Sequence, residues 1–212
     1  MANDKKVFLL VHPHGEGEVQ FAWQTGSGSL LTTTGLDNSV AIFNRRGLLI
    51  ERIRLPGLCV GFSWDTDGDL LGIITGNSSS VILWDANSLK KSSIDLGLRD
   101  TLSCLMWAKN SSVLAVATSR GNIAIYNHTT AKRIPVLGKH SKKITCGAWS
   151  RDSILALGSE DKTVTLNNNE GDTLRIINLR AEPSQITFSG RYRFNFFLMQ
   201  ICLHLLFWLS VL

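Results

Sequence analysis

Short apolar runs separated by polar turns recur along the chain at a regular interval. Four of these runs end in a tryptophan, and successive tryptophans lie 41, 43 and 42 residues apart: Trp23, Trp64, Trp107 and Trp149. A second, mostly aromatic series follows them, with each member directly before Asn: Phe43, Tyr126 and Leu166, or before Asp: Trp84. Two series that share one period of about forty residues indicate an internal repeat.

Each repeat has the polarity pattern of several short strands. In the second repeat, residues 59–64 alternate between apolar and polar positions, residues 70–74 are nearly all apolar, and residues 92–96 are mainly polar. Alternation predicts a half-buried strand, and an unbroken apolar run predicts a strand covered on both faces. A polar last strand suits a sheet edge exposed to water. The pair Asp67-Gly68 supplies a hairpin turn between the first two strands.

This period and strand order are typical of the WD-type propeller blade, whose apolar faces are buried only against neighbouring blades. The sequence therefore predicts an all-β fold, a partial WD-repeat β-propeller of about four blades with four antiparallel strands each. The predicted organisation is an N-terminal strand and loop at 1–18, the blades at 19–188 and a non-propeller hydrophobic tail at 189–212. The apolar run 7–11 would be a stray strand that completes a blade.

The predicted tail differs from the repeats in amino-acid composition. Residues 194–212 contain 19 residues without a charge, of which 15 are apolar, and they follow Arg191 and Arg193. That length just reaches a membrane span, so a membrane-tethered short form is one interpretation. The other is a gene-model or splice-derived end, because the run begins where a fifth blade should bring its next tryptophan, near position 190. We expect the second.

Composition narrows the function classes. The formal net charge is +5, and Lys and Arg are scattered through every repeat, which favours a solvated rim over a nucleic-acid site. The four cysteines form no CxxC pair. Cys104 and Cys146 each stand three residues before a blade tryptophan, so they are expected to be buried free thiols in a reducing compartment.

One group of polar residues predicts a structural hydrogen-bond network. In WD blades a loop His, a strand Ser or Thr, a turn Asp and a strand Trp can form a buried hydrogen-bond chain. His140, Ser159, Asp161 and Thr163 fit three of its parts, with Leu166 in place of the Trp. We expect an incomplete structural network that satisfies buried polar groups, not a catalytic triad.

Other polar clusters carry no expected chemistry either. The segment 12–16 contains two histidines but reads as a solvated loop, and 65–69 lacks the spacing of a calcium loop. No nucleophile is paired with a base, so the sequence predicts no enzyme and no catalytic, metal or cofactor residue. Lys139, Lys142 and Lys143 lie on an expected inter-strand loop and could contact a partner; an ordinary solvated loop is the alternative.

Several segments, loops among them, resemble one family. They are Leu83 to Asn87, Gly121 to His128, Ile134 to His140, Lys142 to Trp149, Leu155 to Gly158 and Glu170 to Thr173. Together they resemble the N-terminal propeller of the WD-repeat protein nineteen family, a large complex A subunit of intraflagellar transport. The resemblance covers about 19–188 and stops at Ser189.

The resemblance implies a non-enzymatic adaptor that acts in retrograde ciliary transport and cilium assembly. Its implied partners are other complex A subunits and ciliary membrane cargo adaptors, without nucleic acid, and with a membrane only if the tail is genuine. Its implied location is the cilium and the cilium base, in the cytoplasm. In that family a second propeller, a helical-repeat arm and a zinc-binding end follow the first propeller.

Overall fold

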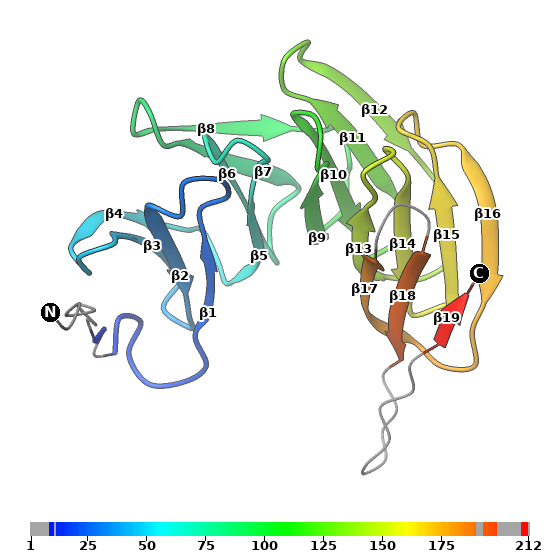
Figure 1. Ribbon diagram of the computed structural model, residues 1–212, viewed down its shortest axis with the longest axis horizontal. Coiled ribbons are helices and arrows are strands. Elements are labelled where there is room, and N and C mark those ends of the chain that lie inside the picture. Colours follow the sequence, from blue (N-terminus) through cyan, green and yellow to red (C-terminus); the bar gives the residue numbers. More distant parts are fainter. Residues whose placement is uncertain (1–8, 11, 190–192, 199–208, 212) are drawn as a thin grey trace, which may run out of the picture.

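The computed structural model describes residues 9–10, 12–189, 193–198 and 209–211 of the chain. Within them, four four-stranded antiparallel sheets follow one another, each with its strands in chain order (Figure 1). The predicted all-β architecture of a partial WD propeller is therefore confirmed.

We number these sheets as blades 1 to 4. Blade 1 contains β1 (Gln20–Trp23), β2 (Leu30–Thr34), β3 (Ser39–Asn44) and β4 (Leu49–Arg54). Blade 2 contains β5 (Cys59–Trp64), β6 (Leu70–Thr75), β7 (Ser80–Asp85) and β8 (Lys90–Asp95). Blade 3 contains β9 (Leu102–Trp107), β10 (Val113–Thr118), β11 (Ile123–Asn127) and β12 (Lys132–Val136). Blade 4 contains β13 (Ile144–Trp149), β14 (Leu155–Ser159), β15 (Thr163–Asn167) and β16 (Thr173–Asn178).

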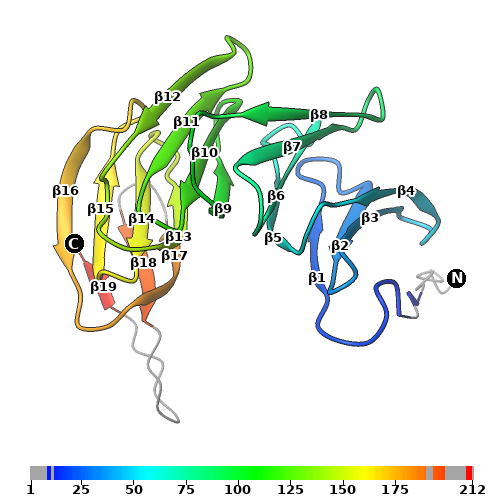
Figure 2. The ribbon, with the colours of Figure 1, turned by 180° about the vertical axis from the view of Figure 1, so that it is seen from behind.

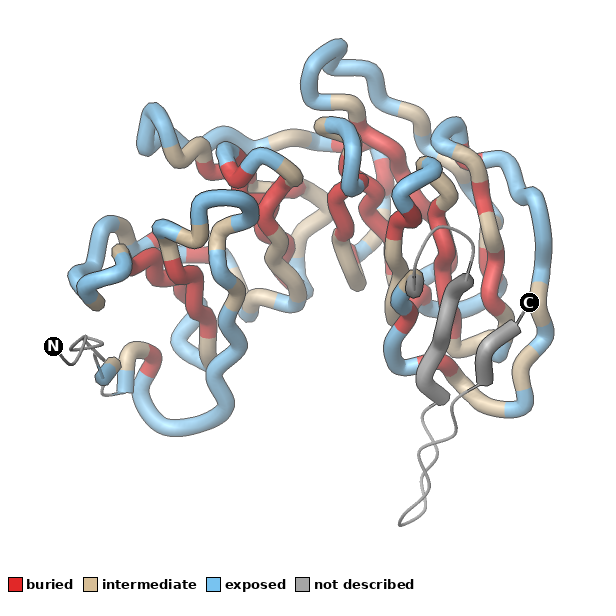
Figure 3. The backbone as a smooth tube through the Cα atoms, viewed as in Figure 1, coloured by how far each residue is buried: buried red, intermediate tan, exposed pale blue. Residues whose placement is uncertain are grey.

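The blades stand around an open arc. The first strand of each sheet faces the concave side and the fourth faces the convex side, in both views (Figures 1 and 2). First strands of neighbouring blades touch, β5 with β9 and β9 with β13. Burial differs between the strands of a blade: in blade 2, β6 is buried throughout whereas β8 is mostly exposed (Figure 3). The polar outer strand and the apolar second strand of each repeat explain the difference.

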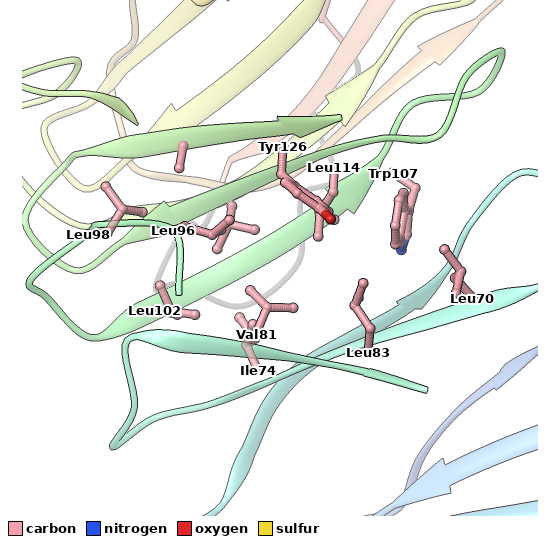
Figure 4. Close-up of a cluster of buried hydrophobic side chains, with 12 residues drawn as sticks. Leu70, Ile74, Val81, Leu83, Leu96, Leu98, Leu102, Trp107, Leu114 and Tyr126 are labelled. Atoms are coloured by element: carbon pink, nitrogen blue, oxygen red, sulfur yellow. The ribbon is translucent and has the colours of Figure 1, made fainter. Parts of the chain in front are cut away.

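The hydrophobic core lies between the blades. One cluster joins blades 2 and 3, and its members point into the space between the two sheets, among them Leu70, Leu83, Trp107, Leu114 and Tyr126 (Figure 4). Similar clusters join blades 1 and 2 and blades 3 and 4. Burying each large apolar side chain is worth about 1.5–3 kcal/mol, so each blade depends on its neighbours for stability.

The four repeat tryptophans end the first strands β1, β5, β9 and β13. Each pairs with a leucine of the second strand: Leu31, Leu71, Leu114 and Leu155. Those leucines pair in turn with a residue of the third strand. In blades 1 to 3 this is the second-series residue, Phe43, Trp84 or Tyr126, and in blade 4 it is Asn167.

The fourth member of the second series therefore differs from the sequence assignment. Leu166 pairs with Ala156, and Asn167 takes the place that the aromatic residues hold in the other blades. The amide of Asn167 is fully buried, and it donates to the Leu155 carbonyl at 3.2 Å and to the Thr165 hydroxyl at 3.0 Å. A polar side chain can occupy this position because its hydrogen bonds are made locally.

After blade 4 the described chain forms a three-stranded sheet of β17 (Pro183–Ser189), β18 (Arg193–Leu198) and β19 (Leu209–Val211). β17 packs on β13 and β14. Residues 190–192, 199–208 and 212 of the predicted tail lie outside the described residues, as do 7, 8 and 11 of the predicted N-terminal strand. That the tail is foreign to the propeller stays a prediction. No helix among the described residues is long and apolar enough to cross a membrane.

Candidate partner-binding surface

Antiparallel blades place their loops at two opposite ends. At one end lie the loops that enter each first strand and those that join second to third strands; we call this end the loop face. In blade 3 its segments are 96–101 and 119–122, and in blade 4 they are 137–143 and 160–162. The predicted polar network and the three candidate lysines all belong to the loop face or to strands next to it.

His140 is the centre of the blade 4 network. Its side chain is completely buried, with Nδ1 3.0 Å from Asp161 Oδ2 and Nε2 3.0 Å from the Thr165 hydroxyl. Because a carboxylate can only accept, Nδ1 carries the proton that points at Asp161 and Nε2 is left as the acceptor for Thr165. Asp161 also accepts from the Thr163 hydroxyl at 2.6 Å and from the Ser141 backbone at 3.1 Å.

One member of the predicted network has a different role, and two residues that were not predicted join the network. Ser159 is buried, but its hydroxyl makes no hydrogen bond with His140. It donates to the Lys142 carbonyl at 3.2 Å and so stabilises the loop 137–143. Thr165 and Asn167 continue the chain of hydrogen bonds beyond His140 instead. The sequence reasoning missed both residues because it expected the last member to be a tryptophan.

Burial and hydrogen bonding set the protonation states of the pair. Burial lowers the pKa of His140 below 6.5, against the opposing attraction of Asp161. Burial would raise the pKa of Asp161, yet hydrogen bonds from Thr163 and Ser141 and the nearby imidazole hold it below 3.8. Near pH 7 the network is therefore a neutral imidazole beside a carboxylate. It has no substrate-facing nucleophile, and it braces the loop that enters blade 4.

A second network, which the sequence reasoning missed, lies in blade 1. His14 was expected in a solvated loop, but its side chain is 1% exposed. Its Nδ1 lies 2.8 Å from Asp37 Oδ1, and its Nε2 lies 2.8 Å from the Thr33 hydroxyl. The expectation was wrong for His14 because partners 19 and 23 residues away bury it.

A spacing in the sequence could have revealed this network. His14 precedes Trp23 by nine residues, as His140 precedes Trp149. In blades 2 and 3 the same position holds buried leucines, Leu55 and Leu98. The position is thus an anchor for the entering loop in every blade, polar in the outer two and apolar in the inner two.

The three candidate lysines divide into two kinds. Lys139 is half-buried, and its ammonium donates to the Gly171 carbonyl at 2.5 Å and the Thr173 hydroxyl at 2.7 Å. Desolvation by burial lowers the pKa of Lys139, with Asp172 opposing. Lys142 and Lys143 are exposed. Lys139 therefore braces the loop, and only the other two side chains are available for contact.

Exposed cations gather around these lysines. The loops of blades 3 and 4 meet where the His140 amide donates to the Gly121 carbonyl at 3.0 Å. The exposed basic residues on these loops, which we call the basic patch, are Arg99, Arg120, Lys142, Lys143 and Lys162. The carboxylates Asp100 and Asp161 are largely buried, and each accepts a backbone hydrogen bond from the neighbouring loop of its blade, from Arg120 and Ser141 respectively. The patch therefore presents net positive charge on a framework fixed by hydrogen bonds.

The cysteines hold neighbouring blades together. The Cys104 thiol donates to the Ile144 carbonyl, and the Cys146 thiol donates to the Pro183 carbonyl, each in the next first strand. Burial raises the pKa of Cys104 to about 12 and that of Cys146 to about 11. Cys59 is also a free thiol. Within the described part of the chain, no three His, Cys, Asp or Glu side chains are grouped so as to hold a metal ion.

Repeated four-stranded blades, first-strand tryptophans and buried His–Asp pairs define a WD-repeat β-propeller domain. Residues 19–193 match the family described as the WDR19 first beta-propeller, and the chain belongs to that family.

The chain is 52% identical over 186 residues to WD repeat-containing protein 19 of Mus musculus, a match that covers 87% of this chain and 14% of that protein. It is 51% identical over 185 residues to the protein of the same name from Homo sapiens, covering 87% of this chain and 14% of that one. With the WD repeat-containing protein dyf-2 of Caenorhabditis elegans it shares 28% identity over 180 residues, which are 84% of this chain and 13% of dyf-2. The chain thus spans about one seventh of the length of the relatives that it matches.

Proposed function

We propose that the chain is a non-enzymatic scaffold that acts in intraflagellar transport as part of complex A. The observation that carries the proposal is membership of the WDR19 first-propeller family, with 52% identity to the mouse relative across 87% of the chain. Its partners would be other complex A subunits and ciliary membrane cargo adaptors. Its place of action would be the cilium and the cilium base.

The basic patch supports a binding role and suggests where contact occurs. Lys142 and Lys143 are exposed, and their own backbone carbonyls accept from the Ser159 hydroxyl and the Glu160 amide. A partner therefore meets cations on a loop that is already ordered, so little conformational entropy is lost on binding. Complementary negative charge on the partner would speed association and fix its orientation.

Affinity purification from ciliated cells tests the proposal. The tagged chain is expressed alone and as the Lys142→Glu, Lys143→Glu double variant, and complex A subunits are quantified by mass spectrometry. A matched control changes Lys109 and Lys132, which are exposed at the opposite end of the blades, to Glu. We expect enrichment of complex A subunits with the native chain and the control, and reduced enrichment with the double variant. Absence of every complex A subunit from the native sample contradicts the proposal.

A further inference from the structure

A groove separates blades 1 and 2 on their outer side. It has a volume of about 410 Å³ and lies between Ile53 and Arg54 of β4 and residues of blade 2 that include Ile82 of β7 and Lys91 of β8. Its inner end is closed by the apolar cluster that joins the two blades. A second cavity of about 340 Å³ also has Arg54 in its wall, together with Arg52 and the carboxylate Asp37.

Two cations line this groove without a partner. Neither the Arg54 nor the Lys91 side chain has an ion pair or a hydrogen bond within the part of the chain that the structure describes. No carboxylate is among the residues that line the groove, so neither charge is neutralised by its lining. Two cations without partners in a concave site attract an anion.

The boundary between blades 2 and 3, the neighbouring seam, has a hydrogen bond between its outer strands. Between blades 2 and 3, Arg133 of β12 donates to the Asp95 carbonyl of β8 at 2.8 Å. Lys91 holds the same register position in blade 2 as Arg133 in blade 3, because each pairs with the second-series aromatic residue of its blade. Arg54 likewise corresponds to Asp95. The hydrogen bond between outer strands in one seam thus has no counterpart in the other among the described residues, and the corresponding residues there, Arg54 and Lys91, are both cations.

Hydroxyl groups and apolar surface complete the groove. The side chains of Ser78, Ser80, Ser92 and Ser93 add neutral donors to its lining. Phosphate oxygens accept from guanidinium, ammonium and hydroxyl groups together, which is the donor set present here. Ile53 and Ile82 offer apolar contact to groups on either side of a bound phosphate.

We propose that the groove between blades 1 and 2 binds a phosphoserine- or phosphothreonine-containing segment of a partner protein. Arg54 and Lys91 would hold the phosphate, and the rest of the groove between the two blades would take the flanking residues in an extended conformation. Because Ile53 and Ile82 line the groove beside these polar donors, a phosphate carried on a peptide fits it better than a free ion. This site is separate from the basic patch, which lies on the loops of blades 3 and 4.

Fluorescence polarisation of the whole chain tests the proposal. The probe is a fluorescein-labelled peptide library with a central phosphoserine between randomised residues, and the comparison is the same library with unmodified serine. The groove variant is Arg54→Gln with Lys91→Gln. The matched control is Arg46→Gln with Lys90→Gln, which removes the same charge from exposed sites outside the groove. Unfolding midpoints of both variants establish that they remain folded.

We expect saturable binding of the phosphorylated library, weakened at least about tenfold in the groove variant and unchanged in the control. Binding should weaken as salt is raised. Equal binding of the unmodified library, or equal binding by the groove variant, would overturn the proposal. It is likewise overturned if only inorganic phosphate or phosphoinositide vesicles bind, or if no probe binds at all.

Discussion

The indole Nε1 of Trp149 donates a hydrogen bond of 3.1 Å to the backbone carbonyl of Met106, across the boundary between blades 4 and 3. Trp107 repeats the relationship with Ser63 of blade 2, again at 3.1 Å. In both cases the acceptor directly precedes the tryptophan of the preceding blade. Trp64 holds the same position in blade 2, but its buried Nε1 has no partner in the described residues. The seam between blades 1 and 2 therefore lacks this bond.

The difference between the seams predicts unequal costs for one substitution. Trp107→Phe and Trp149→Phe should each lower the free energy of unfolding by about 1–3 kcal/mol more than Trp64→Phe does. All three changes remove the same indole volume, but the first two remove a hydrogen bond, whereas Trp64→Phe removes a buried donor that has no partner in the described residues. Urea denaturation measures the three values. Equal losses at the three positions would show that the indole bonds add nothing.

The His140–Asp161 pair predicts how stability depends on pH. Because burial lowers the pKa of His140, the unfolded chain takes up a proton at a higher pH than the folded chain does. Stability from this group is thus complete above pH 6.5 and falls as the pH drops below that value. Asp161, whose pKa is lowered from 3.8, contributes stability that is lost only in stronger acid.

Replacing His140 by the leucine that blades 2 and 3 carry at this position should flatten the loss of stability between pH 7.5 and pH 5, on about the scale of single-group linkage. The exposed His128→Leu variant is the control and should keep the native slope. Unfolding free energies at a series of pH values give both slopes. An unchanged slope in the His140→Leu variant would mean that this histidine does not titrate as its burial requires.

Alanine substitutions at two glycines with positive φ should distinguish the cost of backbone strain from the cost of steric crowding. Gly121 has φ +81°, and a Cβ there would collide with the His140 carbonyl; Gly138 has φ +66°, and a Cβ would meet nothing within 4 Å. Gly138→Ala should cost about 1–2 kcal/mol from strain alone. Gly121→Ala should cost about 1–3 kcal/mol more, because the loops of blades 3 and 4 must separate. Thermal unfolding compares them, and similar costs would refute the close approach of these loops.

The hydrophobic tail should be dispensable for the four blades. The family match ends at residue 193, and the clusters that join blades 1 to 4 contain no residue beyond Leu157. Deleting residues 190–212 should therefore improve solubility and leave the main unfolding transition in place. Sedimentation and urea denaturation of the two chains test this. Loss of blade 4 structure on deletion would show that the tail belongs to the propeller.

Strands and blade order could be predicted because period-two alternation and the tryptophan spacing are local properties of the sequence. The sites were harder. His14 lies ahead of the first repeat, and its burial depends on Asp37 and Thr33, which only the fold brings near. Asn167 was passed over for Leu166 because polarity alone does not reveal that a buried amide finds partners. Arg54 and Lys91 line one groove only because the fold places two blades side by side.

Cross-linking mass spectrometry tests most directly whether the loop face of this chain binds complex A. The tagged chain is purified from ciliated cells after treatment with a lysine-reactive cross-linker. Links to complex A subunits should concentrate on Lys142, Lys143 and Lys162, all exposed on the loop face. Lys109 and Lys132, exposed at the other end of the blades, should form few. Links confined to Lys109 and Lys132, or no link to any complex A subunit, would contradict the account.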